Sequence, residues 1–235
     1  MVALFGRCHH SLLGCSWPEA RRTRSCDGPS QERKLFRLGD LHARPRGNQP
    51  YSPAMALSIS DICDLLVHRG GKAYDGEAVT QLEHALQSAA RAEAEGASVA
   101  LVAAALLHDF GHLLKGQDEM PTQHGIDDGH QYAALPFLRS LFGDDVLEPI
   151  RLHVDAKRYL CATRADYFDT LSPVSQRSLA LQGGVYSAED ARAFQALPYS
   201  ADAVRVRLWD ERAKEPGAAT PTLAHFVVTL EAARG

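Results

Sequence analysis

The sequence lacks the features that mark membrane, secreted and nucleic-acid-binding proteins. No apolar run approaches the roughly 18 to 20 residues that a membrane-spanning helix needs, so no membrane partner is expected. The net charge of −4 is too mild to predict a nucleic-acid partner. Only Cys63 and Cys161 lie beyond residue 26. Two cysteines cannot build a disulfide framework, so a reducing, cytoplasmic location is predicted.

Residues 1–54 differ in composition from the rest of the chain. They hold nine Lys and Arg against four Asp and Glu, with no sustained apolar period. We predict a disordered or irregular basic leader here. An organelle transit peptide and a translation start at Met55 are the alternatives. Cys8, Cys15 and Cys26 form no tight Cys-x-x-Cys pair, so a zinc site is not expected.

Residues 55–235 are predicted to form one all-α domain. Apolar residues make up 45% of the chain, which is ordinary for a protein with a packed core. Apolar positions recur at helical spacing, and no convincing strand alternation is found. The predicted helices cover residues 58–68, 78–95, 99–108, 127–142, 144–159, 187 onward, 200–214 and 220 onward.

The motif HDFGH, residues 108–112, is the most informative stretch of the domain. It follows the run 100–107, which is apolar on all sides and therefore predicts a buried central helix. At the end of that helix an imidazole and a carboxylate stand next to each other. Together they can bind a divalent metal, and the carboxylate has a second oxygen that can bridge to another.

Further histidines and an aspartate follow at intervals that suit the same site. Each lies in or at the end of a predicted helix, so a helical bundle could direct all of them inward. Imidazole and carboxylate ligands suit iron, manganese or zinc, and five or more of them around a shared carboxylate describe a two-metal site. The candidate metal ligands are His84, His108, Asp109, His130, His153 and Asp210.

This pattern resembles the HD-domain superfamily, whose signature is a distant His, an adjacent His-Asp pair and a distant Asp. The two additional histidines match the subgroup that holds two metals. Within it, the chain resembles the phosphonate-cleaving mixed-valent di-iron oxygenases, because Tyr74 and Glu77 match their Tyr-x-x-Glu segment. Residues 125–130, 153–160 and 172–178 are also similar. The resemblance spans roughly residues 57–230 and implies an HD-domain helical bundle with a buried di-metal site.

The resemblance also implies a role for each ligand. One iron would be held by His84, His108, Asp109 and Asp210, and the other by Asp109, His130 and His153. Asp109 would thus bridge an Fe(II)/Fe(III) pair. In the family, the tyrosine that matches Tyr74 occupies a metal position at rest and leaves when substrate arrives, so Tyr74 and Asp109 are the predicted catalytic residues.

A substrate-binding set follows from the same resemblance. The glutamate that matches Glu77 meets the amino or ammonium group of the substrate, where opposite charges attract. Positive charge and hydrogen-bond donors for the phosphonate would come from His112, Lys157, Ser175 and Arg207. The ordinary alternatives are a solvated Lys157, an Arg207 paired with a neighbouring acid, and a Ser175 that only caps a helix.

The implied reaction is oxygen-dependent cleavage of the carbon–phosphorus bond of a small organophosphonate. The substrate would be a 1-hydroxy-2-(amino or trimethylammonio)ethylphosphonate, dioxygen the co-substrate, and the products phosphate and glycine or glycine betaine. The alternative is an HD-type phosphohydrolase, in which the same metals activate water for attack on a nucleotide or another phosphoester. Hydrolysis does not require Tyr74 and Glu77, which favours the oxygenase. A regulatory HD module would be expected to lack ligands, whereas all six are present.

Overall fold

The computed structural model describes residues 56–73, 76–114 and 125–235. The predicted leader, Met55 and Tyr74 therefore lie outside the described residues. Within the described ranges the chain forms helices, and the only strand-like pairings are the isolated bridges Ala73–Thr80 and Phe142–Arg234. The all-α prediction is confirmed. The helices are α1 (Ile59–Arg69), α2 (Gln81–Ala94), α3 (Val99–Leu107), α4 (Phe110–Leu114), α5 (His130–Ala133), α6 (Leu135–Leu138), α7 (Asp144–Thr163), α8 (Tyr167–Thr170), α9 (Pro173–Leu181), α10 (Ala188–Gln195), α11 (Ser200–Arg212) and α12 (Leu223–Ala232).

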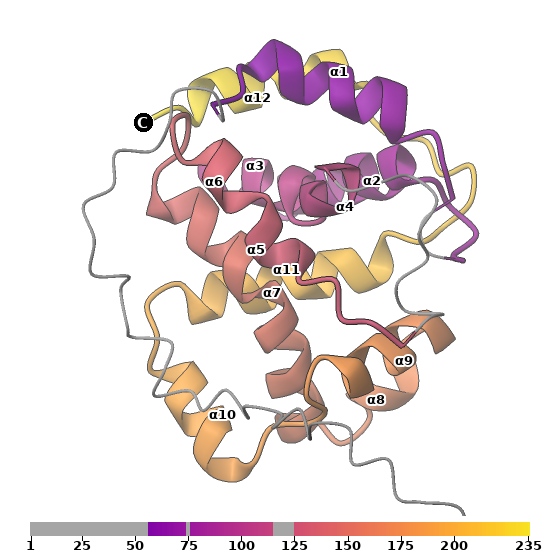
Figure 1. The fold of residues 1–235 in the computed structure, drawn as a ribbon, viewed down its shortest axis with the longest axis vertical. Helices are drawn as coiled ribbons and strands as arrows, with labels where there is room; N and C mark the ends of the chain where they lie inside the picture. Colours follow the sequence, from indigo (N-terminus) through magenta and orange to yellow (C-terminus); the bar gives the residue numbers. More distant parts are fainter. Residues whose placement is uncertain (1–55, 74–75, 115–124) are drawn as a thin grey trace, which may run out of the picture. The chain divides into compact units, whose positions relative to one another are not determined.

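Helix α3 is the centre of the main core, as its unbroken apolar sequence predicts. Every residue from Leu101 to Leu107 is buried. Helices α2, α7, α11 and α12 pack against it. Figure 1 shows α1 and α12 on one side of the α2–α4 layer, with α7 and α11 on the other. The C-terminal end of α3 therefore lies between α2, α7 and α11, and these three helices carry several of the predicted ligands.

Helices α7 and α11 extend beyond this core and hold the smaller helices together. Their farther parts pack against α8, α9 and α10 in two smaller apolar clusters. Trp209 of α11 is completely buried, and its indole Nε1 donates to Glu95 at the end of α2. This pair of helices consequently joins the ligands near α3 to the residues of α9.

The start of α2 is set by a capping box that the sequence analysis missed. The side chain of Thr80 accepts from the backbone N–H of Glu83, and the Glu83 carboxylate accepts from the N–H of Thr80. The helix therefore begins at Gln81 and not at residue 78 as predicted. His84 lies in its first turn and is completely buried.

The single helix predicted over residues 127–142 is wrong, because α5 and α6 divide this stretch. Pro136 cannot donate a backbone hydrogen bond and lies near the start of α6. Gly129, whose φ of 59° is left-handed, precedes α5. At Gly111 of α4 a Cβ atom would lie 2.0 Å from the carbonyl oxygen of His130. Glycine is therefore needed at position 111 for α5 to approach α4 so closely.

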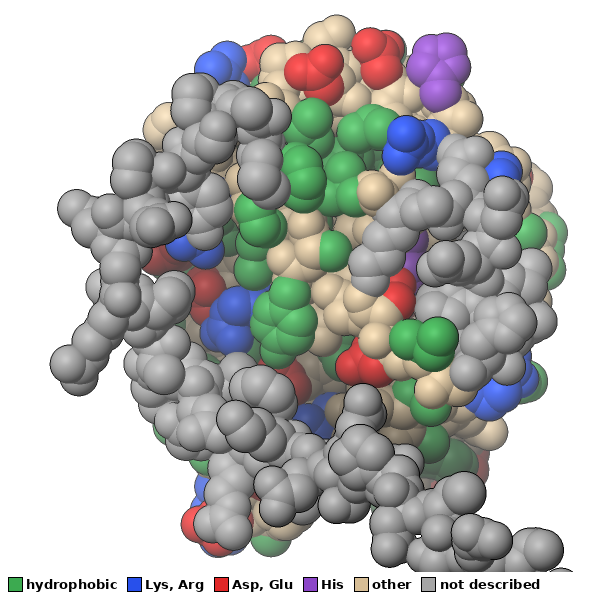
Figure 2. All heavy atoms as spheres, in the orientation of Figure 1, with side chains coloured by type: hydrophobic (Ala, Val, Ile, Leu, Met, Phe, Trp, Pro, Cys, Tyr) green, Lys and Arg blue, Asp and Glu red, His purple; other side chains and the backbone are tan. Residues whose placement is uncertain are grey.

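The described surface mixes apolar and charged side chains. On the face drawn in Figure 2, hydrophobic, acidic and basic groups lie interspersed, as the small net charge leads one to expect. No helix in the described ranges is both long enough and apolar enough to cross a membrane.

Candidate metal centre

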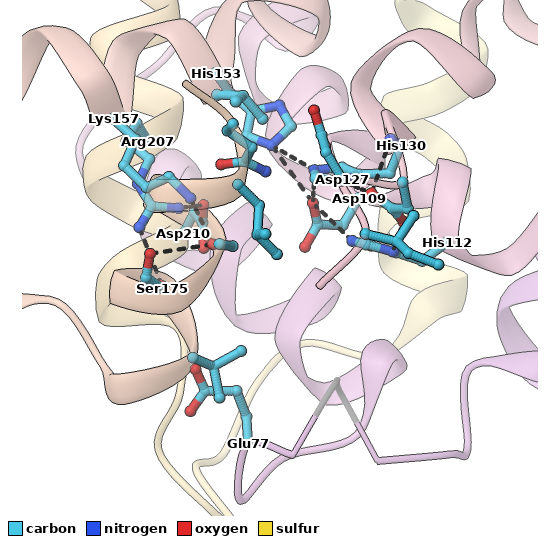
Figure 3. Close-up of a pocket in the computed structure, with 17 residues that line it drawn as sticks. Glu77, Asp109, His112, Asp127, His130, His153, Lys157, Ser175, Arg207 and Asp210 are labelled. Carbon is cyan, nitrogen blue, oxygen red and sulfur yellow. Dashed lines mark hydrogen bonds and ion pairs between the residues drawn. The ribbon is translucent and has the colours of Figure 1, made fainter. Parts of the chain in front are cut away.

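The structure brings all six predicted metal ligands together in one buried cluster. His84 comes from α2, His130 from the start of α5, His153 from α7 and Asp210 from α11. The His-Asp pair lies at the junction between α3 and α4. Each of the six residues is at most 6% exposed. Figure 3 shows three of them, Asp109, His130 and His153, converging on one wall of a pocket.

Four ligands form the first half of the cluster. The Nε2 atoms of His84 and His108 lie 3.2 Å apart. Oδ2 of Asp109 lies 3.5 Å from each of these two nitrogens. Asp210 completes the group, with Oδ1 3.5 Å from His84 Nε2 and Oδ2 3.8 Å from His108 Nε2. These atoms surround a position that a single ion could fill.

Three ligands form the second half, and Asp109 belongs to both halves. Its other oxygen, Oδ1, lies 3.2 Å from His130 Nε2 and 3.5 Å from His153 Nε2. Those two nitrogens are 3.1 Å apart. Asp109 thus directs one oxygen to each half, which is the geometry that a bridging carboxylate requires.

Hydrogen bonds fix the orientation of every histidine in the cluster. The Nδ1 atoms lie 2.7 to 2.9 Å from oxygens that can only accept: the carbonyl groups of Ala213, Ala105 and Ile150, and a carboxylate oxygen of Asp128. Each Nδ1 must therefore carry the proton. The Nε2 atoms of all four rings are left to face the centre, as they do in histidine metal sites with fixed tautomers.

The donor set fits metal ions better than it fits protons alone. Neutral imidazoles in these tautomers would direct two lone pairs at each other across 3.1 and 3.2 Å, so a positive species must lie between them. In addition, no hydrogen-bond donor of the described residues reaches Asp109 Oδ2 or Asp210 Oδ1, although both atoms are buried. Buried carboxylate oxygens without donors are costly unless a cation compensates them.

Burial and charge divide the histidines into two kinds. Burial lowers the pKa of His108 to about 4, and it also lowers the pKa of His153. These rings are therefore neutral, which is the form that binds metal. Burial opposes protonation of His130 as well, but the carboxylates of Asp109 and Asp128 outweigh it and raise its pKa to about 9. Without metal, His130 would keep a proton that an ion must displace.

Asp128 connects a ligand with a predicted substrate-binding residue. Its Oδ1 accepts from the ring and the backbone N–H of His130, and its Oδ2 lies 2.8 Å from His112 Nδ1. The rings of His112 and His130 stack with centroids 4.1 Å apart. No role in the site was predicted for Asp128 from the sequence. Its place before a candidate ligand, in a segment similar to the oxygenases, was the available signal.

The remaining predicted substrate-binding residues line the same pocket. Lys157 is 3% exposed and donates to Ser178 Oγ at 2.7 Å. Arg207 donates to Asp210, Glu211 and the hydroxyl of Tyr167. The alternative of a solvated Lys157 is therefore wrong, whereas the alternative of an Arg207 paired with a neighbouring acid is confirmed.

Ser175 lies beside Arg207, which donates to its hydroxyl at 3.4 Å, and Glu77 lines another part of the same pocket. The backbone N–H of Ser175 is capped by Ser172, and its hydroxyl donates to Glu211 at 3.2 Å. Figure 3 shows Glu77 apart from the ligand cluster. Its Oε1 accepts from Ser172 Oγ and forms an ion pair with Lys214 Nζ. The contacts of Ser178 and Lys214 were not predicted from the sequence, because they join distant segments: Ser178 lies in α9 and bonds Lys157 of α7, and Lys214 follows α11 and bonds the serines at the start of α9.

Comparison with known proteins agrees with this geometry. A family profile described as the HD domain matches residues 82–210, more than half of the chain and from the first turn of α2 to the last predicted ligand. The chain belongs to the HD-domain family.

Two relatives narrow the family further. A hydroxymethylphosphonate dioxygenase from Gimesia maris is 41% identical over 174 residues, which cover 74% of this chain and 86% of that protein. A 1-hydroxy-2-(trimethylamino)ethylphosphonate dioxygenase (glycine-betaine-forming) from Leisingera caerulea is 39% identical over 163 residues, covering 69% and 83%. The expected membership in the phosphonate dioxygenase group of HD-domain proteins is therefore confirmed.

Proposed function

We propose that this protein is a mixed-valent di-iron oxygenase that uses dioxygen to cleave the carbon–phosphorus bond of a 1-hydroxyphosphonate. The observation that carries the proposal is one pocket in which the two-part ligand cluster adjoins buried cationic and hydroxyl groups. Its lining includes Asp109, His130, His153 and Asp210 together with Lys157, Arg207, Ser175 and Ser178. The names of the two relatives support the same substrate class.

Lys157 is the residue best suited to the phosphonate. Among the residues that the structure describes, no carboxylate forms an ion pair with it. Burial, with repulsion from Arg207, lowers the pKa of Lys157 to about 7. A buried ammonium group without a counter-charge is costly. A bound phosphonate would supply that charge and stabilise the protonated form.

Ser178 and His112 complete this part of the pocket. Ser178 accepts from Lys157 and donates to the carbonyl of Ser175, so it holds the lysine in place. His112 has its Nδ1 on Asp128 and its Nε2 3.9 Å from Asp109 Oδ1, at the border between the ligand cluster and the pocket. The phosphonate would thus lie between Lys157 and His112, beside the second half of the cluster.

The overall reaction balances with dioxygen as the oxidant. A 1-hydroxyphosphonate R–CH(OH)–PO₃²⁻ and one O₂ give the carboxylic acid of R and phosphate, so that carbon and phosphorus each gain one oxygen. The irons, when bound, would supply dioxygen activation and electron transfer. The six ligands of the cluster would hold them, with Asp109 shared between the two halves, and Lys157 would bind the phosphonate. The apolar side chains Val154, Val174 and Leu181 in the pocket wall limit the access of water.

Three substrates fit the proposed reaction. The 2-amino and 2-trimethylammonio 1-hydroxyethylphosphonates of the sequence prediction would give glycine and glycine betaine. Hydroxymethylphosphonate, for which R is hydrogen, would give formate.

A direct comparison of substrate classes tests the proposal. Iron-loaded protein is mixed with each hydroxyphosphonate and with a nucleotide and a simple phosphate ester, and phosphate is measured with and without dioxygen. We expect phosphate from a hydroxyphosphonate only when dioxygen is present. Phosphate released from the esters at a comparable rate without dioxygen would instead support the phosphohydrolase.

A further inference from the structure

The carboxylate of Glu77 already has a cationic partner inside the protein. Lys214 Nζ lies 3.2 Å from Glu77 Oε1, and both side chains are 11% exposed. The same oxygen accepts from the hydroxyl of Ser172, the residue that caps α9. Glu77 lies before α2 and Lys214 follows α11, so three separate segments meet at this carboxylate.

Lys214 is held firmly beside Glu77 and Ser175, two residues that line the pocket. It donates to Ser175 Oγ at 2.9 Å and to Ser172 Oγ at 3.2 Å. It also lies 3.4 Å from both carboxylate oxygens of Glu211. The adjacent carbonyl of Ala213 accepts from His84 Nδ1. Its position is therefore fixed from both sides, by the serines of α9 and by a metal-ligand histidine.

The charges around Lys214 are matched without any ligand. Arg207 pairs with Glu211 and with Asp210. Lys214 pairs with Glu77 and with Glu211. Glu77 and Glu211 are thus balanced by Lys214 and Arg207, and Asp210 remains for the metal. A substrate ammonium group at Glu77 would add a positive charge beside Lys214, where charges of the same sign repel.

We infer that Lys214 determines substrate specificity by holding Glu77 in an internal ion pair, so that the pocket favours 1-hydroxyphosphonates without a cationic group. This inference rests on the proposed function and selects hydroxymethylphosphonate among its three substrates. An ammonium-bearing substrate must displace Lys214 from Glu77 or share the carboxylate with it, and either event lowers its affinity. Lys214 acts through Glu77 and does not touch the reacting atoms.

Binding measured without dioxygen tests the inference independently of turnover. Calorimetry on iron-loaded protein gives the Kd of hydroxymethylphosphonate and of 2-amino-1-hydroxyethylphosphonate. Wild-type protein is expected to bind hydroxymethylphosphonate more tightly. Lys214→Gln, which keeps hydrogen-bonding ability without charge, should shift the ratio of the two Kd values toward the amino compound by about tenfold. Glu77→Gln in the Lys214→Gln background should abolish that gain.

Arg212→Gln is the matched control. Arg212 lies two residues before Lys214 and pairs with Glu95, outside the pocket, so its ratio should equal that of wild type. Tighter binding of the amino compound by wild type, or a ratio unchanged by Lys214→Gln, would overturn the inference. An equal loss of affinity for both compounds in Lys214→Gln would show that Lys214 only supports the structure, and it would also overturn the inference. Dioxygen-dependent turnover with an unchanged ratio would refute this inference alone, whereas absence of turnover with both compounds would refute the proposed function.

Discussion

The Nε2 atoms of His84 and His108 lie 3.2 Å apart in a fully buried site, while the Nδ1 atom of each ring donates to a backbone carbonyl. Two imidazoles held in this way need a cation between them. The Nε2 atoms of His130 and His153 form a second such pair, 3.1 Å apart, in which Nδ1 of His130 donates to the Asp128 carboxylate and Nδ1 of His153 to a backbone carbonyl. The Asp109 carboxylate joins the two pairs, so the protein should bind two metal ions through one shared residue.

Substitution of Asp109, which belongs to both halves of the cluster, should therefore weaken the binding of both ions. Substitution of a ligand that belongs to one half should weaken the binding of one ion. We expect Asp109→Asn to lose most of both metal ions and Asp210→Asn to lose mainly the ion of the first half. Metal analysis of the purified variants measures this. Asp202→Asn is the control. Asp202 is a half-exposed residue of α11, the helix that carries Asp210, and it pairs with Arg205. This variant should keep the metal content of the wild type. Retention of two ions by Asp109→Asn would contradict the bridging role.

Metal binding to the second half should release a proton. The raised pKa of His130, about 9, keeps this ring protonated at pH 7 in metal-free protein, and an ion at its Nε2 must displace that proton. Calorimetric titration with ferrous iron in buffers of different ionisation enthalpy counts the protons released. The count from His130 should be about one at pH 7 and should fall toward zero above pH 9. A count that does not depend on pH over this range would rule out His130 as the source.

The ligand set was readable from the sequence because it depends on residue type and on helical spacing. A buried apolar run ending in His108 and Asp109 predicted both α3 and the cluster at its end. The supporting residues were not readable in this way. Asp128 can hold His112 and His130 because α5 packs closely against α4 at Gly111. Lys214 can reach Ser172 and Ser175 because the end of α11 lies beside the start of α9. Such contacts between distant segments leave no period in the sequence. Likewise, α5 and α6 divide a stretch that was predicted as one helix, and Pro136 lies at the start of the second.

Asp128 should control metal affinity although it is not a predicted ligand. It holds the ring of His130 through Oδ1 and that of His112 through Oδ2. Asp128→Ala should weaken iron binding by roughly 10- to 100-fold, as loss of a carboxylate behind a histidine ligand generally does. Competition with a chelator of known affinity measures the effect. Asp127→Ala is the control, because Asp127 accepts only from the backbone of Gly129 among its described hydrogen bonds. Equal effects of the two substitutions would assign the loss to the loop and not to Asp128.

Phosphonate affinity should depend on pH through Lys157. Because its pKa is lowered to about 7, the free protein loses this positive charge as the pH rises above 7, and binding of the anion should weaken. Lys157→Met should bind about 10- to 100-fold more weakly at pH 6. The ratio of wild-type to variant affinity cancels the ionisation of the substrate itself. This ratio should fall toward one between pH 6 and 9, and a constant ratio would contradict the assignment.

The most direct test of the central claim is the simultaneous measurement of dioxygen uptake and phosphate release by the iron-loaded protein acting on a 1-hydroxyphosphonate. The balanced reaction predicts one phosphate for each dioxygen consumed, with both signals absent when either the phosphonate or the dioxygen is withheld. Phosphate formed without uptake of dioxygen would contradict the claim.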